Sequence, residues 1–357
     1  MGRVYTNKKK IINDPIYGFI KISFESLFEL VEHSYFQRLR RIKQLGLTYF
    51  VYPGATHTRF QHALGSLHLM GMAIEVLRSK GVNISLEEEE AALSAILLHD
   101  MGHGPFSHAL EESIVPGIHH EALSILFMHA LNKEFRGRLD MAIRIFTGQY
   151  PKQFLHQLIS GQLDMDRLDY LKRDSFFTGV TEGVIGSDRI VRMLNVVDDQ
   201  LVVDHKGIYS IEKFLIARRL MYWHVYLHKA VLSSEILLLN ILQRARELAG
   251  QGVELFCTPP LHHFLYQRNA SKDFFGDEQP GQKPEISESV ARNLDMFAGL
   301  DDNDIMASAK VWADHPDRVL SILCKKLKNR DLSRIEIREE PFPRGYIDDI
   351  RQKVRQL

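Results

Sequence analysis

Hydrophobic residues recur with helical spacing along most of the chain. In residues 26–45 they fall on a repeat of about 3.6 residues with arginines between them, which predicts an amphipathic helix pair with a basic exposed face. The same periodicity predicts helices over the following segments: 71–81, 119–131, 138–148, 154–175 and 210–249.

Residues 84–100, "ISLEEEEAALSAILLHD", carry a clear helix start signal. Ser85 is suited to the N-cap, and Glu87 to Glu90 follow in the first turn, where carboxylates favour the positive end of the helix dipole. The rest of the segment is apolar up to His99. We therefore expect a buried helix whose C-terminus presents His99 and Asp100.

Strand signals are short: "GFIKIS" at 18–23, "QLVVDHKGIYSI" at 200–211 and "RIEIREE" at 334–340. From 251 to about 290 the chain becomes rich in glycine, proline and charge, which indicates a boundary or a long surface excursion. We predict a mostly α protein with small β hairpins, consisting of a main domain over 1–250 and a smaller α+β accessory segment over 251–357.

Composition narrows the class of protein. Of the 357 residues 45% are hydrophobic, and 45 basic residues balance 45 acidic ones, so no global charge draws the chain to nucleic acid or membrane. Two cysteines, Cys257 and Cys324, allow at most one disulfide and suggest a reducing compartment. With no apolar leader and no window of eighteen apolar residues, we expect a soluble cytoplasmic protein without a membrane partner.

Histidine and acidic residues are concentrated in four stretches: "HTRFQHALGSLH" (57–68), "HDMGHGPFSH" (99–108), "HHE" (119–121) and "DMDRLDYLKRD" (164–174). A borderline divalent metal needs imidazole nitrogens and carboxylate oxygens converging from different elements. Such a set can come from these stretches: His62, His99, Asp100 and Asp166. Gly102 and Gly104 relax the backbone enough for the adjacent His99 and Asp100 to reach one ion.

Each piece alone has an ordinary structural explanation. Any one of the 17 histidines is more often a surface or core residue than a ligand. The pair Asp164 and Asp166 is typical of a solvated helix face, and Tyr170 and Tyr226 could be core aromatics. Taken singly, these residues leave both interpretations open.

In combination, "TRFQHALG", "LLHDMGHGPFSH" and "DMDRLDYLKRD" occur in the order found in one family. The chain resembles the HD-domain phosphohydrolases, specifically the deoxynucleoside triphosphate (dNTP) triphosphohydrolase branch. Over residues 10–250 the segments "IINDPIYGFI", "FQRLRRIKQLG" and "ARRLMYWHVYLHK" match as well, and the likeness thins afterwards. The resemblance implies an HD-domain helical core with its metal site within 62–166, and no sterile-alpha-motif domain.

The resemblance also assigns roles at the reaction centre. It makes four residues the metal ligands: His62, His99, Asp100 and Asp166. It places three histidines against the phosphates: His103, His108 and His120. We expect His108 to protonate the leaving 5′-oxygen, oriented by Glu111 one helical turn on. Relatives carry an aspartate at that orienting position, so the longer glutamate is a departure.

Substrate contacts follow from the same resemblance. Four basic residues would bind the triphosphate: Arg59, Arg167, Arg218 and Lys229. Tyr170 would pack on the deoxyribose where a 2′-hydroxyl would clash, while Asp174 accepts from the 3′-hydroxyl. Gln44, Leu45 and Tyr226 complete the wall. Tyr222 stands where relatives often have histidine, and we interpret His224 and His228 as packing and wall residues although their spacing suits a metal.

Several members of this branch are oligomers that bind a second nucleotide through N-terminal segments. The matching residues here are Lys10, Ile11, Asn13, Glu32, Gln37 and Arg40, with Glu32 placed to read a guanine edge. The alternative is a basic, solvated helix with a chance acid. The hypothesis is a homo-oligomer, dimer or tetramer, that responds to an activating nucleotide.

Three functions compete. The first is metal-dependent hydrolysis of a dNTP to deoxynucleoside and inorganic triphosphate; the second is an HD-type phosphohydrolase of another nucleotide or phosphoester; the third is non-catalytic binding of nucleotide or single-stranded nucleic acid. The donor set suits Mn²⁺, Fe²⁺, Ni²⁺ or Zn²⁺ about equally and Mg²⁺ less well, and a second Mg²⁺ could accompany the phosphates.

Overall fold

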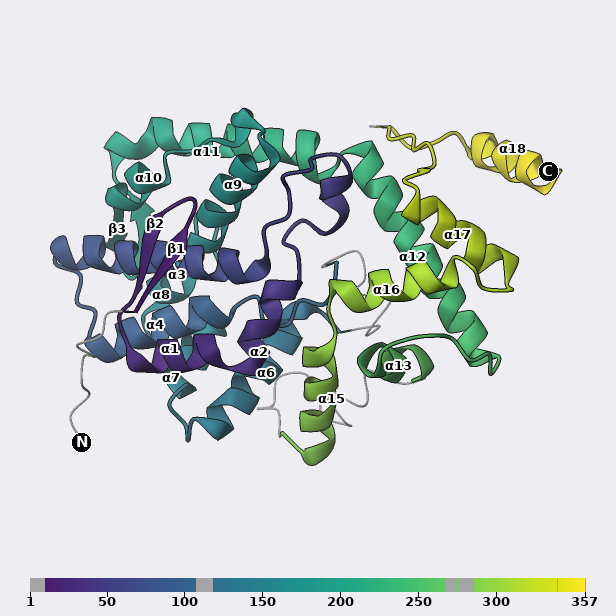
Figure 1. Ribbon diagram of the computed structural model, residues 1–357. Coiled ribbons are helices and arrows are strands. Elements are labelled where there is room, and N and C mark those ends of the chain that lie inside the picture. The colour runs from purple at the N-terminus through teal and green to yellow at the C-terminus, as the bar shows by residue number, and fades with distance from the viewer. Residues whose placement is uncertain (1–9, 107–117, 268–273, 275–285, 339, 357) are drawn as a thin grey trace.

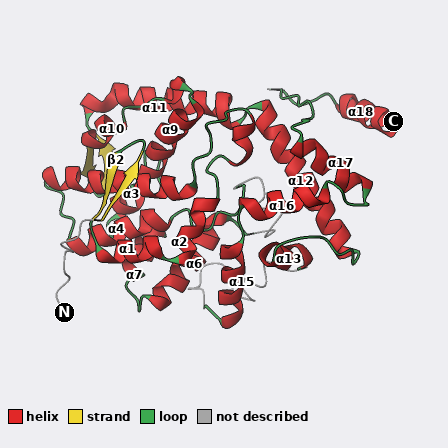
Figure 2. Cartoon of the chain, in the orientation of Figure 1, coloured by secondary structure: helices red, strands yellow, loops and turns green. Residues whose placement is uncertain are grey.

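The computed structural model describes residues 10–106, 118–267, 274, 286–338 and 340–356. It is mostly helical with two small antiparallel sheets, which confirms the predicted fold class (Figures 1 and 2). The main helices of the first 250 residues are α1 (Glu25–Glu32), α2 (Ser34–Gln37), α3 (Arg59–Ser79), α4 (Leu86–Leu98), α6 (His120–Glu134), α7 (Asp140–Phe146), α8 (Gln153–Gln157), α9 (Met165–Thr178), α10 (Ser187–Met193), α11 (Ile208–Met221) and α12 (Lys229–Gly250).

The strands form two hairpins. β1 (Lys10–Asp14) pairs with β2 (Gly18–Ile22), and β3 (Leu194–Val197) pairs with β4 (Gln200–Val203). The predicted strand signal at 200–211 is therefore confirmed only over its first four residues, because a turn of helix begins at His205 and leads into α11.

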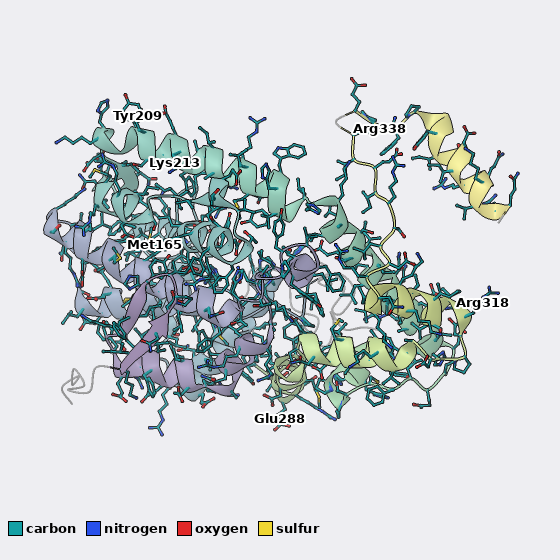
Figure 3. The ribbon with its side chains drawn as sticks, turned by 45° about the horizontal axis from the view of Figure 1, so that its top comes forward. Met165, Tyr209, Lys213, Glu288, Arg318 and Arg338 are labelled. Atoms are coloured by element: carbon teal, nitrogen blue, oxygen red, sulfur yellow. The ribbon has the colours of Figure 1, made fainter. Side chains whose placement is uncertain are left out.

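The centre of the fold is α3, which packs against α4 and α9 while α4 packs against α7 (Figure 1). Met70, Ala73 and Ile74 of α3 are fully buried. Figure 3 shows Met165 in the interior at the start of α9, whereas Tyr209 and Lys213 lie on the outer side of α11. The elements that carry the histidine and acid motifs thus meet in the middle of the protein.

The predicted N-cap of α4 is confirmed. The Ser85 hydroxyl accepts a hydrogen bond from the Glu88 amide at 3.2 Å, and the Glu88 carboxylate accepts one from the Ser85 amide at 2.8 Å. At its other end α4 stops at Leu98, and His99 and Asp100 follow in the interior.

The helical segment predicted over 210–249 is broken. A π-helical turn at Tyr222–Tyr226 follows α11, and α12 then leaves at an angle of 56°. The Nδ1 atom of His228 accepts from the Ala230 amide at 3.2 Å and caps the new helix. Over the described residues no single helix is long and apolar enough to cross a membrane; only the bent pair 205–226 and 229–250, taken together, passes a test of length and composition.

The region after 250 contains α13 (Pro259–Tyr266), α15 (Glu288–Gly299), α16 (Asp302–Trp312), α17 (Arg318–Lys328) and α18 (Arg344–Arg355). α13 and α17 pack on α12, and α15 packs on α2 and α6. The strand predicted at 334–340 was wrong for its described residues, and no strand occurs in the described part after 250. The hydrophobic and polar residues of this segment alternate as in a strand, but none of the described strands pairs with it, and Ile337 is exposed.

Candidate active site

A cavity of about 420 Å³ lies where the motif-bearing elements meet. Its walls come from the 3-10 turn η2 (Gly46–Phe50) and the residue pair before it, α3, the loop after α4, α6, α9, the π-helical turn and α12. The lining residues are Gln44, Leu45, Gly46, Thr48, Arg59, Asp100, His103, Phe106, His120, Asp166, Tyr170, Asp174, Tyr222, Tyr226, Val231 and Glu235.

Three of the four predicted metal ligands converge at the edge of this cavity, and one of them, Asp166, is part of its lining. One donor atom each of His62, His99 and Asp166 lies within 4.8 Å of the others. Asp166 Oδ1 is 3.0 Å from His62 Nε2 and 3.6 Å from His99 Nε2. α3, the end of α4 and the first turn of α9 each supply one of these residues, as a metal site built across elements requires.

The hydrogen bonds behind the two imidazoles orient them. His99 Nδ1 lies 2.6 Å from the Ile96 carbonyl, which can only accept, so Nδ1 carries the proton. His62 Nδ1 lies 2.8 Å from Asp169 Oδ2 in the same manner. Both Nε2 atoms are buried without a hydrogen-bond partner in the described part of the chain. Two nitrogen lone pairs and a carboxylate oxygen facing one another fit a divalent cation.

The ionisation of this cluster reflects concentrated negative charge. Burial lowers the pKa of His62, but the adjacent carboxylates of Asp166 and Asp169 outweigh that effect and raise the pKa to about 10. Burial raises the pKa of Asp166, yet the two histidines hold it well below the usual range. The carboxylates therefore favour a positive charge within this cluster, and a metal ion would supply that charge in place of protons.

Asp100 lies beside the cluster but is engaged elsewhere. Its Oδ2 accepts from Arg59 Nη1 at 2.5 Å and is 3.7 Å from His62 Nε2, and its Oδ1 is 3.4 Å from His99 Nε2. Arg59, predicted as a triphosphate ligand, thus pairs with a predicted metal ligand. Both face the cavity, so a phosphate entering it would compete for the same guanidinium.

A chain of buried charges connects His62 to the N-terminal hairpin. Asp169 accepts from Arg173 Nε at 2.8 Å and Nη2 at 3.0 Å, and Arg173 Nη1 donates to Asp14 at 2.8 Å. Gly65 of α3 makes room, because a Cβ atom there would overlap the Asp169 carboxylate and the Arg173 guanidinium. The glycine of "HALG" therefore lets α9 bring its acids to His62.

Residues after 250 hold the loop that follows the His99–Asp100 pair. Asp302, 1% exposed, accepts from the Phe106 amide at 2.9 Å and from the Lys43 amide at 3.0 Å. Phe106 has φ +54°, a left-handed conformation that a non-glycine residue adopts at some cost. The C-terminal region thus fixes two backbone segments that lead into the cavity, those at Gln44 and at Phe106.

Arg38 also supports this loop. It is fully buried, and its Nη2 donates to the carbonyls of Met101 at 3.0 Å and His103 at 2.6 Å. Its guanidinium lies over the ring of Phe297 from α15. Burial together with nearby arginines lowers its pKa to about 9.

Two of the three histidines predicted to face the phosphates, His103 and His120, line the cavity. The rings of His103 and His120 stack with centroids 3.9 Å apart, and both line the cavity. Gly102 permits this contact, since a Cβ atom there would overlap the His120 carbonyl. Burial and the charge of Arg59 hold the pKa of His103 well below its ordinary value. The other two predicted catalytic residues, His108 and Glu111, lie outside the described residues.

The predicted sugar wall lines the cavity: Gln44, Leu45, Tyr170, Asp174 and Tyr226. Asp174 Oδ1 is 2.7 Å from His57 Nε2, and its Oδ2 accepts from the Tyr226 hydroxyl at 2.8 Å. The carboxylate is therefore oriented by two partners and retains lone pairs for a further donor.

Three predicted triphosphate ligands are not among the lining residues: Arg167, Arg218 and Lys229. Arg167 donates to Asp164 Oδ2 at 2.6 Å, and Lys229 is exposed. The guanidinium of Arg218 is 5.9 Å from the ring of Tyr222, which does line the cavity. Asp164 is the N-cap of α9 rather than part of a solvated face, while His224 is exposed and His228 caps α12.

The predicted regulatory residues lie on the N-terminal elements, apart from the lining of the cavity. Lys10 is 3.6 Å from Glu25, and Gln37 accepts from Arg40 Nε at 2.8 Å. The remaining ones are exposed: Ile11, Asn13 and Glu32. The β1–β2 hairpin packs on α1 and α3 through β2 (Figure 1). Their part in nucleotide binding stays a prediction.

Four residues that support or line the site were not predicted from the sequence: Asp169, Arg173, Asp302 and Glu235. Asp169 and Arg173 belong to a motif that was singled out, and their i, i+4 spacing was available as a signal. No sequence signal marked Asp302 or Glu235, because their positions depend on contacts between distant parts of the chain.

Comparison with known proteins agrees with this geometry. Residues 59–174 match the HD domain, and residues 185–250 match the HD associated region. A phosphohydrolase from Bacteroides thetaiotaomicron, known from its crystal structure, is 54% identical with a TM-score of 0.90, over 98% of this chain and 83% of that one.

Two curated relatives extend the comparison. YwfO of Bacillus subtilis, an uncharacterised protein, is 33% identical over 91% of this chain and 71% of its own length. The deoxynucleoside triphosphate triphosphohydrolase SAMHD1 homologue of Dictyostelium discoideum is 32% identical over 68% of this chain, which spans about half (51%) of that protein. The chain therefore belongs to the HD-domain phosphohydrolases and is homologous to the SAMHD1 triphosphohydrolases.

Proposed function

We propose that this phosphohydrolase acts on a dNTP and releases deoxynucleoside and inorganic triphosphate. The observation that carries the proposal is the meeting of His62, His99 and Asp166 beside a cavity that Asp166 lines together with Tyr170 and Asp174. Homology to proteins named as dNTP triphosphohydrolases supports it.

His62, His99 and Asp166 would hold the metal ion, with Asp100 as the fourth ligand once Arg59 turns to the substrate. A divalent ion bound there polarises a phosphate oxygen and lowers the pKa of a water molecule. The family relation and the donor set support a divalent metal without identifying it.

The chain's own residues would supply binding and proton transfer. Arg59 offers a guanidinium to the phosphates, and the stacked pair His103 and His120 faces them across the cavity. Water adds to the α-phosphorus, the bond from phosphorus to the 5′-oxygen breaks, and the leaving oxygen takes a proton. For that proton His108 remains our candidate, with Glu111 as its orienting partner.

The sugar wall supports deoxyribose over ribose. Tyr170 would cover the face where a 2′-hydroxyl would project, and Asp174, already fixed by His57 and Tyr226, would accept from the 3′-hydroxyl. Arg167, Arg218 and Lys229 would reach the triphosphate only by moving from their present positions. A second Mg²⁺ on the phosphates would reduce the need for them.

Two alternatives predict different results. An HD-type enzyme for another nucleotide or phosphoester would hydrolyse ribonucleotides or monoesters at least as well as dNTPs. A non-catalytic nucleotide or single-strand binding protein would turn over neither. We also propose, from the N-terminal residues named above, an oligomer that responds to an activating nucleotide, which sedimentation with and without dGTP would test.

The direct test uses the purified protein with each dNTP and NTP, Mn²⁺ or Mg²⁺, and dGTP as a candidate activator. Anion-exchange chromatography resolves the products. Deoxynucleoside plus triphosphate, absent with Asp166→Ala, is the expected result. Release of pyrophosphate or orthophosphate from every nucleotide, or no turnover with any dNTP, would contradict the proposal.

A further inference from the structure

Glu235 lines the active-site cavity from the side of α12. It lies one helical turn after Val231, which lines the same cavity, so this face of α12 is turned inward. α12 packs on η2, whose Gly46 and Thr48 are also part of the wall. The bend at residues 227–228 gives α12 this position, as its departure from α11 in Figure 1 shows.

Glu235 differs from every other carboxylate among the described lining residues. Asp100 pairs with Arg59, Asp166 faces two histidines, and Asp174 bonds to His57 and Tyr226. Glu235 has no hydrogen bond or ion pair with any residue in the part of the chain that is described. Burial alone raises the pKa of its carboxyl to about 7, and no charged group among the described residues contributes to that shift.

The charge of an unpaired carboxylate decides which part of a bound nucleotide can lie next to it. It repels phosphate oxygens, so it requires either hydrogen-bond donors or a cation. The 3′-hydroxyl already has a matching acceptor in Asp174, which leaves the base as the donor-bearing part.

The four bases differ in what they offer a carboxylate. An ionised carboxylate is acceptor-only and can take two parallel hydrogen bonds. The guanine edge presents N1–H next to the 2-amino group, two adjacent donors. Adenine and cytosine present a donor beside an acceptor, and thymine presents one N–H between two carbonyls. Guanine alone satisfies both oxygens.

Resting on the proposed dNTP hydrolysis, we propose that Glu235 is a specificity-determining residue that reads the guanine edge and makes dGTP the preferred substrate. The proposal requires that the base lie toward α12 while the triphosphate lies toward the metal cluster. That orientation keeps the phosphates away from Glu235, the one lining acid without a positive or donor partner among the described residues.

The test compares kcat/KM for dGTP, dITP, dATP, dCTP and dTTP in the wild type and in Glu235→Gln at pH 8.5. dITP lacks only the 2-amino group and therefore isolates one of the two hydrogen bonds. A good bidentate contact discriminates by about 1–3 kcal/mol, so we expect dGTP to lose roughly tenfold relative to dATP in the variant, and the dGTP-over-dITP preference to disappear. Glu212→Gln, an exposed glutamate of α11, is the matched control and should leave all ratios unchanged.

The other results are informative as well. An equal loss for all five substrates with a raised Mg²⁺ requirement would mean that Glu235 holds a cation with the phosphates, which overturns base reading. Unchanged ratios would overturn it too. If the wild type hydrolyses no dNTP the proposed function fails, and calorimetric binding of dGTP against dITP to the same two proteins still tests Glu235.

Discussion

The two sides of the active-site cavity differ in whether their acidic side chains have partners. At the metal side every acid has a partner: Asp166 faces His62 and His99, Asp100 faces Arg59, and behind them Asp169 is held by Arg173. At the α12 side Glu235 has no hydrogen bond or ion pair with any residue that the structure describes.

The difference separates two tasks. Fixed geometry around a metal requires ligands whose other atoms are already bonded, because an unrestrained imidazole or carboxylate would lose affinity by rotating away. Ligand selection requires a group that is still unsatisfied, because only such a group gains a bond when the right base arrives. The following predictions test that division, beginning with the largest effect.

Replacing a ligand should abolish activity. Asp166→Ala removes a carboxylate that lies 3.0 Å from His62 Nε2 and 3.6 Å from His99 Nε2, so we expect stoichiometric metal to be lost and turnover to fall below detection. Metal content by elemental analysis and product chromatography measure the two effects. Full metal occupancy in this variant would show that the ion binds elsewhere.

Weakening the support of a ligand should have a smaller effect. Asp169→Asn removes the charge behind His62, and loss of such an orienting partner typically lowers metal affinity about 10–100-fold. Titration of metal into the apoprotein measures it. Asp14→Asn, at the far end of the same charge chain, should lower affinity less, and Asp188→Asn on the surface should not change it. Equal affinity in all three variants would contradict the positioning role.

The C-terminal support should affect turnover more than metal binding. Asp302→Ala leaves the amides of Phe106 and Lys43 without their acceptor, and each buried unsatisfied group costs about 1–3 kcal/mol. We expect a lower melting temperature and a lower kcat with unchanged metal affinity. Asp314→Ala, at an exposed site, is the control. If folded Asp302→Ala protein kept the wild-type kcat, Asp302 would contribute to stability but not to the positioning of the active site.

The smallest effect concerns stability against pH. The pKa of the Glu235 carboxyl is raised from 4.5 to about 7, so the folded state binds its proton more tightly than the unfolded state. That contribution to stability is fully present below about pH 4.5 and is lost as the pH rises through 7. Glu235→Gln should therefore melt higher than the wild type at pH 8.5 and nearly equally at pH 5. A pH-independent difference would indicate that the carboxylate is paired.

Much of this arrangement was readable from the sequence because its signals are local. Helical periodicity located the main helices, Ser85 marked the start of α4, and the motifs around His62, His99 and Asp166 predicted their convergence. The mostly α fold followed from the same patterns.

The remainder depends on contacts that no local pattern encodes. Asp302 meets partners 196 and 259 residues away, and Glu235 reads as an ordinary polar position until the bend before α12 turns it inward. The alternation at 334–338 is typical of a strand, but a strand forms only where a neighbouring edge is available.

The measurement that tests the central claim most directly is hydrolysis of dGTP by the metal-loaded protein in ¹⁸O-labelled water, followed by mass spectrometry of the products. Attack on the α-phosphorus at the metal cluster predicts one ¹⁸O in inorganic triphosphate and none in deoxyguanosine. Label in the deoxyguanosine, or label divided between dGMP and pyrophosphate, would contradict it.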